Sequence, residues 1–120
     1  VLLLDQIPRN IFRQSPHAFA TDSLAVSIAA RAIERRFDAA TESSLRVFFY
    51  MPFEHAEDLV LQERAVNLVE QLRDAEYTKF AILHRDIIAR FGRFPHRNAI
   101  LGRKSTPEEL QFLAEGGFAG

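Results

Sequence analysis

Residues 56–91 read AEDLVLQERAVNLVEQLRDAEYTKFAILHRDIIARF and decide the fold class. Apolar residues recur in this stretch every three or four positions, the spacing that places them on one face of an α-helix. The stretch holds two such stripes, which consist of Leu61, Ala65, Leu68, Val69 and Leu72 and then of Phe80, Leu83, Ile87 and Phe91. The pattern predicts two helices, over about residues 56–74 and 76–91, and Gly92 is expected to end the second one.

Two more helices are predicted before this stretch. Thr21 is a favourable N-cap, and Asp22 follows it in the first turn, where the helix dipole favours a negative charge. Apolar residues at helical spacing extend this helix to Phe37. A short helix is predicted over residues 42–50, and Pro52 is expected to end it because proline cannot continue the backbone hydrogen-bond ladder.

One more helix is predicted after the same stretch. Thr106, Pro107 and Glu109 have the spacing of a capping box, in which side chains satisfy the first N–H groups of a helix. We expect this helix to cover about residues 107–115 and to stop at Gly116.

All of these segments have the period of a helix, and none shows the two-residue alternation or the tight turn of a β-hairpin. The predicted fold class is therefore all-α, a single domain over residues 1–120 built of antiparallel helix pairs in a bundle or a helical repeat. The side chains expected to be largely buried are Phe48, Phe49, Leu68, Leu72, Phe80, Leu83, Ile87 and Phe91.

Composition excludes several classes of function. The 120 residues include no cysteine, which excludes disulfides, thiolate metal sites and a cysteine nucleophile. No apolar run approaches the roughly 18–20 residues of a membrane helix. The net charge of -1 gives no bulk attraction to nucleic acid. We expect a cytoplasmic protein that needs no cofactor or metal and has neither nucleic acid nor membrane as a partner.

The charge is small in total but unevenly distributed. Residues 38–76 carry nine acidic and three basic side chains, whereas residues 77–106 carry seven basic and one acidic. One interpretation is that the two regions pair with each other inside the fold. The other is that the basic region forms a face that binds an anion, because arginine pairs well with carboxylate and phosphate.

Two clusters could carry chemistry. Glu54, His55, Glu57 and Asp58 could hold a hard cation, although acidic residues at a helix start explain them more simply. In residues 90–103, Arg90 and Arg93 would share a helix face and repel each other unless an acid lies between them. That acid could come from a ligand or from within the chain, where Asp5, Glu54 and Glu57 are the candidates.

The chain resembles the bacterial family known as domain of unknown function 924. The segments that carry the resemblance are residues 4–13 (LDQIPRNIFR), 18–22 (AFATD), 50–57 (YMPFEHAE), 90–98 (RFGRFPHRN), 101–103 (LGR) and 105–109 (STPEE). The resemblance implies an all-helical fold similar to tetratricopeptide helix hairpins, and no established activity. It also implies an aromatic-rich segment before the Leu-Asp-Gln motif, so that the chain would be the C-terminal two thirds or so of the family's domain.

Two hypotheses for function follow. The first is a binding or interaction module for an anionic small molecule or an acidic protein partner. The second is an enzyme acting on an anionic substrate, with histidine as the proton carrier and arginine stabilising negative charge. The candidate ligand-binding residues are Asp5, Gln6, Arg9, Asn10, Arg13, His55, Glu57, His84, Arg90, Arg93, His96, Arg97, Asn98 and Arg103.

Two expectations concern the first residues of the chain. Asp5 is predicted to pair with Arg90, Arg93 or Arg97, because the basic region is the nearest supply of cations. The apolar residues 1–4 cannot all face one neighbouring helix, so we expect some of them to be buried by a preceding segment, by a second copy of the chain or by a neighbour in a crystal.

Overall fold

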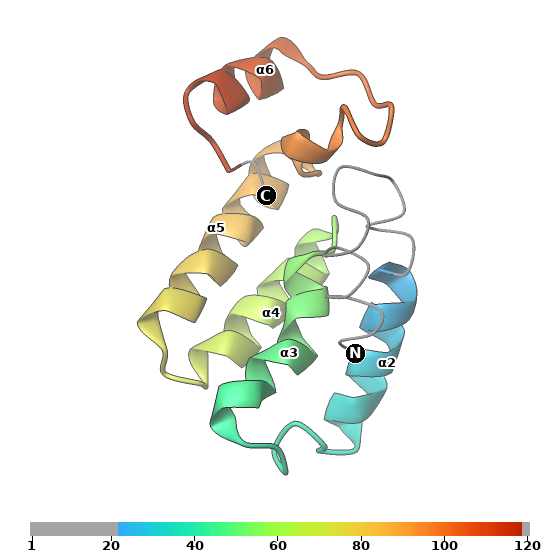
Figure 1. Cartoon of the computed structure of the whole chain (residues 1–120), viewed down its shortest axis with the longest axis vertical. Helices are drawn as coiled ribbons and strands as arrows, with labels where there is room; N and C mark the ends of the chain where they lie inside the picture. Colours follow the sequence, from blue (N-terminus) through green and yellow to red (C-terminus); the bar gives the residue numbers. More distant parts are fainter. Residues whose placement is uncertain (1–21, 119–120) are drawn as a thin grey trace.

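The computed structural model describes residues 22–118, and every regular element in this range is a helix (Figure 1). The elements are α2 (Asp22–Glu34), α3 (Ser43–Glu54), α4 (Leu59–Glu70), α5 (Ala75–Phe91), the short 3-10 helix η2 (Pro95–Arg97) and α6 (Pro107–Ala114). Residues 22–118 contain no strand, so the predicted all-α class is confirmed. Within these residues, no helix combines the length and the apolar character that crossing a membrane requires.

Helices α2 to α5 form a unit that we call the helix array. Successive helices run in opposite directions, and α5 lies at one edge (Figure 1). The array is held together by apolar side chains from neighbouring helices. Ala29, Phe53 and Ala65 form one buried cluster, which joins α2, α3 and α4. Small side chains at such contacts let the helix axes approach closely, and each buried large side chain contributes about 1.5–3 kcal/mol.

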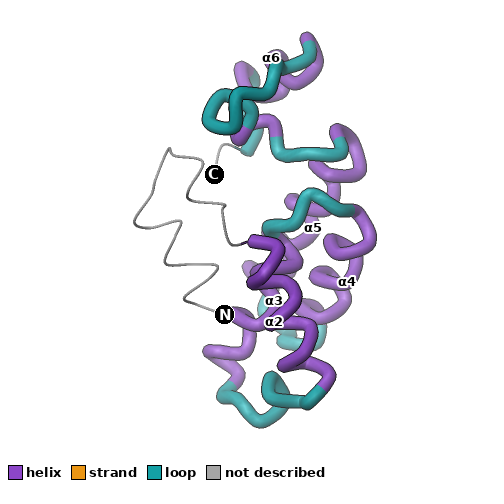
Figure 2. Tube along the Cα trace, turned by 90° about the vertical axis from the view of Figure 1, so that its right-hand side faces the viewer, coloured by secondary structure: helices purple, strands orange, loops and turns teal. Residues whose placement is uncertain are grey.

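A second unit, the C-terminal cap, comprises residues 92–118. It sits at the far end of α5, where both views show α6 beyond the body of the array (Figures 1 and 2). The cap rests on α5 through an apolar layer, whose buried members are Ile87, Ile88 and Phe94. The half-buried rings that pack on this layer are Phe91, Phe112 and Phe118.

Helix ends follow local rules. Asp58 and Asp74 cap α4 and α5 by accepting hydrogen bonds from backbone N–H groups in the first turn. Gly92 ends α5 with a φ of 74°, a conformation that suits glycine, as predicted. The capping box of Thr106 and Glu109 at the start of α6 is also confirmed.

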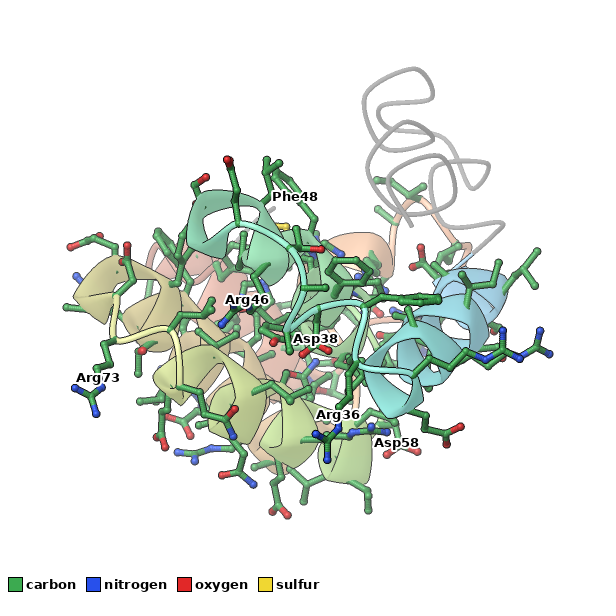
Figure 3. All side chains as sticks on the ribbon, turned by 90° about the horizontal axis from the view of Figure 1, so that it is seen from below. Arg36, Asp38, Arg46, Phe48, Asp58 and Arg73 are labelled. Atoms are coloured by element: carbon green, nitrogen blue, oxygen red, sulfur yellow. The ribbon has the colours of Figure 1, made fainter. Side chains whose placement is uncertain are left out.

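The turn between α2 and α3 is held by side chains. Arg46 donates from Nε to the Asp38 carbonyl oxygen, at 2.9 Å, and from Nη2 to the Thr41 carbonyl oxygen, at 3.2 Å. Figure 3 shows Arg46 and Asp38 next to each other at this turn. The Tyr50 hydroxyl donates to the Asp38 carboxylate at 2.6 Å. Burial, together with this hydrogen bond, raises the pKa of Tyr50 above its usual value.

Several predicted helix boundaries were wrong. Helix α2 ends at Glu34 rather than at Phe37, and α4 ends at Glu70 rather than at Asp74. Pro52 does not end α3 but lies inside it, and the helix continues to Glu54. Proline removes one backbone hydrogen bond there, but it lies in the last turn and its buried ring packs in the core. Helix α4 begins at Leu59 rather than at Ala56, because Asp58 takes the capping position.

The predicted core was partly wrong. Ile87 is buried, but Phe80 and Leu83 are 48% and 38% exposed. Both are exposed residues of α5, which is the helix at the edge of the array (Figure 1). The remaining predicted core residues are half-buried, namely Phe48, Phe49, Leu68, Leu72 and Phe91.

Candidate functional site

The candidate site lies where the helix array meets the cap, and its charges are organised by arginines of the cap. Arg93 makes a two-fold pair with Glu109, with its Nε and Nη2 at 2.9 and 2.8 Å from the two carboxylate oxygens. Glu109 is 2% exposed and also accepts from the Thr106 N–H and the Asn98 amide. The hydrogen bond from Arg93 is the main cause that lowers the pKa of Glu109 to about 2.

Arg103 joins the cap to the array. Its Nη1 and Nη2 donate to the two carboxylate oxygens of Glu57, at 2.8 and 3.1 Å, across 46 residues of sequence. Glu57 also accepts from the Phe94 N–H at 2.7 Å. Burial alone would raise the pKa of Glu57, but these hydrogen bonds outweigh it, and the pKa is lowered. Arg103 Nε donates to the Asn98 side-chain oxygen, so Asn98 is part of the same network.

Arg97 is buried and contacts a backbone carbonyl, an aromatic ring and a carboxylate. Its Nη2 donates to the His55 carbonyl oxygen at 3.0 Å, and its guanidinium carbon lies 4.6 Å from the centre of the Phe94 ring. Its Nη1 is 3.9 Å from a carboxylate oxygen of Asp22, which is too long for a hydrogen bond. Arg90 differs, because it is exposed and lies over the rings of Phe91 and Phe112.

These contacts bear on the two interpretations of the basic region. Arg93 and Arg103 pair with acids of this chain, which supports internal pairing for both of them. Glu57, one of the candidate acids for Arg90 and Arg93, pairs with Arg103 instead. The acid that pairs with Arg93 is Glu109 of the tail, which was not among the candidates. The predicted pairing of Asp5 lies outside the described residues.

Two histidines, His84 and His96, lie against aromatic rings of the cap, and His55 lies next to His84. The His84 ring centre is 6.2 Å from that of His55 and 4.7 Å from that of Phe118, while His96 lies 5.2 Å from Phe118. His84 Nδ1 is 2.6 Å from the Phe80 carbonyl oxygen, a contact that favours a proton on this nitrogen. Burial, followed by the charge of Arg97, lowers the pKa of His96 to about 4, so His96 is neutral at pH 7.

An open cleft of about 520 Å³ lies beside this network. It is formed by the start of α2, the turn between α3 and α4, and the segment that follows Phe94. Its lining residues are Asp22, Ser23, Val26, His55, Ala56, Glu57, Asp58, Leu61, Arg97 and Leu101. The cleft combines an apolar side with charged groups, as small-molecule sites commonly do.

The structure brings only some of the predicted site residues together. His55, Glu57 and Arg97 meet in the cleft. His84 and His96 lie among the aromatic rings, and Arg93, Asn98 and Arg103 belong to the ion-pair network of the cap. The five candidates nearest the start of the chain lie outside the described residues, namely Asp5, Gln6, Arg9, Asn10 and Arg13.

Several cleft residues were not predicted as site residues. Asp22 was predicted only as a residue of the first turn of a helix. Asp58 belongs to the acidic cluster that was interpreted as a helix start, and its role as the N-cap of α4 agrees with that interpretation. Leu61 was assigned to a core stripe, and nothing in the sequence distinguished Leu101. Among residues 22–118, no three His, Asp or Glu side chains are arranged to hold a metal ion.

Comparison with known proteins places the chain in a bacterial context. Residues 1–117 match the model of a family described as bacterial protein of unknown function (DUF924). The structure of a protein of unknown function from Agrobacterium tumefaciens, ATU0120, is similar, with 56% sequence identity and a TM-score of 0.93. The similarity covers 96% of this chain and 65% of that one, so the chain spans less than two thirds of its length. Among curated proteins none matches the chain.

Proposed function

We propose that this chain, which belongs to the bacterial family of unknown function DUF924, is a helical binding module whose cleft takes up an acidic group of its ligand at Arg97. The observation that carries the proposal is the state of Arg97. Arg93 and Arg103 are used by two-fold pairs with carboxylates of this chain, whereas Arg97 lines the open cleft together with Asp22 and His55. A carboxylate or phosphate of a ligand in this cleft would lie beside an arginine, the side chain that pairs best with such groups.

The other charges of the cleft are compatible with such a ligand. Glu57 is neutralised by Arg103, and Asp58 accepts the Leu61 N–H at the start of α4, where the helix dipole favours it. Val26, Leu61 and Leu101 offer apolar surface. The ligand chemistry that fits is one acidic group on an apolar body. A small molecule and an acidic side chain of a protein partner both have this chemistry.

One observation favours the alternative of an enzyme. His55 lies in the same open cleft as Arg97, which is the convergence that acid–base chemistry on an anionic substrate would need. Histidine carries protons near neutral pH, and arginine would stabilise developing negative charge. Turnover of a bound compound that is lost in His55→Gln, with binding retained, would favour the enzyme over the binding module.

A thermal-shift screen tests the proposed function. Carboxylates, phosphorylated metabolites and nucleotides form one arm, and short acidic peptides form the other, because a ligand that binds only the folded state raises the melting temperature. We expect Asp22→Asn to strengthen binding by removing the competing carboxylate and Arg97→Lys to weaken it. Arg90→Gln, a change to an exposed arginine of the same segment, is the control and should leave binding unchanged.

Two results would contradict this function. One is the absence of a shift with any acidic compound or peptide. The other is weaker binding in Asp22→Asn, which would indicate a cationic ligand. The cytoplasmic location stays a prediction, which cell fractionation tests. Association of a second copy through residues 1–4 also stays a prediction. Analytical ultracentrifugation of a variant with polar residues at these positions tests it.

A further inference from the structure

The outer side of α5 has an arrangement that neither the core nor the cleft uses. This surface, the α5 outer face, consists of Glu76, Lys79, Phe80, Leu83, Asp86 and Arg90, all of them exposed. Helix α5 is at the edge of the array, with its outer side turned away from α4 (Figure 1). Exposed apolar residues in one stripe on an edge helix commonly mark an interaction surface.

Leu83 is the centre of this face. With about 100° of rotation per residue, Glu76 and Arg90 lie within about 20° of the Leu83 direction, one seven residues before it and one seven residues after it. Lys79 and Asp86 lie about 40–60° to one side of this line, and Phe80 lies about 60° to the other side. The face therefore has a charged edge, an apolar edge and a leucine in the middle.

The order of the charges on this face is complementary to the same order read in the opposite direction. Along the helix, the face reads negative, positive, leucine, negative, positive, at Glu76, Lys79, Leu83, Asp86 and Arg90. If a second α5 runs antiparallel with Leu83 on the two-fold axis, Glu76 lies opposite Arg90 of the partner subunit and Lys79 opposite Asp86 of the partner subunit. The two apolar edges meet on the same side, because this two-fold rotation keeps each edge on its own side.

We propose that the α5 outer face is a self-association surface, on which a second copy of this chain docks antiparallel through its own α5. A parallel arrangement is disfavoured because it would place each charge opposite its own kind. Helix α5 has 17 residues and is about 25 Å long, so this contact is smaller than the roughly 1,600 Å² of a standard stable interface. The dimer is therefore weak and forms at high protein concentration.

The same charges also act within α5, where Asp86 pairs with Arg85 at 3.1 Å. Spacing allows two more pairs in the helix, since Glu76 and Lys79 are three residues apart and Asp86 and Arg90 are four apart. A charge exchange separates the two roles. In Lys79→Glu with Asp86→Lys, like charges become neighbours within each helix, which weakens the helix. Across the two-fold axis, however, the two exchanged side chains carry opposite charges and attract each other again. The double variant therefore restores a dimer but cannot restore pairing within one helix.

Sedimentation velocity over a wide concentration range, at low salt, tests the proposal. We expect a monomer–dimer equilibrium that Lys79→Glu weakens about tenfold, since it introduces two repulsive contacts per dimer. The double variant should return to the affinity of the original chain, whereas Lys104→Glu, the same change at an exposed site in the cap, should have no effect. Circular dichroism melts confirm that each variant is folded.

Three results would overturn the proposal. A monomer at every concentration would show that the α5 outer face does not bind a second copy, so that another segment or another protein would have to cover it. An unchanged dimer in Lys79→Glu would place the contact elsewhere, including at residues 1–4. A double variant that associates no better than Lys79→Glu would show that the two charges do not face each other.

Discussion

The helix array and the C-terminal cap use different forces, although they belong to one short chain. In the array, alanine and a few large apolar side chains are buried between neighbouring helices, as in the cluster of Ala29, Phe53 and Ala65. In the cap, buried polar groups such as Glu109, Arg97 and Asn98 hold a loop-rich segment in place. Apolar packing varies little with pH, whereas an ion-pair network depends on the protonation of its acids.

The difference reflects how much regular structure each part has. Between Phe91 and Pro107 the chain has one turn of 3-10 helix, so its backbone groups need side-chain partners. Arg93 donates to the Lys104 carbonyl and Arg103 to the Phe94 carbonyl, and both also bind a carboxylate. Arginine suits this role because one planar group can serve several acceptors at once. The arginines of the cap therefore act in part as substitutes for secondary structure.

The largest effect is expected in the array. Phe53 is completely buried, and Phe53→Ala should lower the free energy of unfolding by roughly 3–5 kcal/mol because it leaves a cavity that the helices cannot fill. Chemical denaturation measures the loss. Leu110→Ala, at a leucine that is 58% exposed in α6, is the control, and it should change the stability by less than about 0.5 kcal/mol. Equal losses in the two variants would break the distinction between core and surface.

A smaller but still large effect is expected for the buried acid of the cap. Glu109→Gln keeps the shape of the side chain but removes its charge, which leaves the half-exposed Arg93 without an ion pair. We expect a loss of about 2–3 kcal/mol, below the range for fully buried pairs because water reaches Arg93. Hydrogen exchange should show that the loss falls on residues 93–118. A loss spread evenly over α3 and α4 would contradict the separate basis of cap stability.

The next effect sharpens the comparison through pH. His96 has a pKa of about 4 in the folded chain against 6.5 as a free side chain. Between these values the unfolded chain binds a proton that the folded chain does not, so the stability falls as the pH drops. We expect a loss of about 1–2 kcal/mol between pH 6.5 and pH 5. Urea denaturation at several pH values measures it, and His96→Phe should flatten this part of the profile. If the free energy of unfolding depended on pH equally steeply in His96→Phe, another group would be responsible for the loss.

The smallest effect is expected at one of the polar contacts within the array. Tyr50→Phe removes the hydrogen bond from the Tyr50 hydroxyl to Asp38 but keeps the buried ring. The loss should be about 0.5–1.5 kcal/mol, the usual net value of one hydrogen bond. Thermal unfolding at neutral pH measures it. A loss as large as that of Glu109→Gln would mean that the array also depends on polar contacts.

Helical periodicity predicted most of the fold. The stripes of residues 56–91, the glycine at position 92 and the capping box at Thr106 depend on local chemistry, which the sequence displays directly. Periodicity also shows which side of a helix is apolar, but not which neighbour covers it. For this reason Phe80 and Leu83 were predicted to be buried, although they lie on the outer side of α5. Pro52 was misjudged because its effect depends on how near it is to the end of the helix.

The candidate site was harder to predict, because its contacts join distant residues. Glu57 and Arg103 are 46 positions apart, and Arg93 and Glu109 are 16 apart, so no local pattern relates them. The sequence showed that acidic and basic regions existed, and internal pairing was one of two interpretations. The cleft also uses apolar residues such as Leu61 and Leu101, whose types are those of ordinary core residues. Only the packing of the cap against the array brings them together with Arg97.

A residue-resolved NMR titration tests the central contrast between the array and the cap most directly. Acidification from about pH 7 to about pH 3 destabilises the fold in two steps. His96 is protonated first, and only in the unfolded chain, because its pKa is lowered in the folded one. At lower pH the same holds for Glu57 and Glu109, whose ion pairs are then lost. We predict that amide signals of residues 93–118 lose their native positions at a higher pH than those of α3 and α4. Loss of both sets of signals at the same pH would contradict the account, because it would mean that one cooperative core holds both parts.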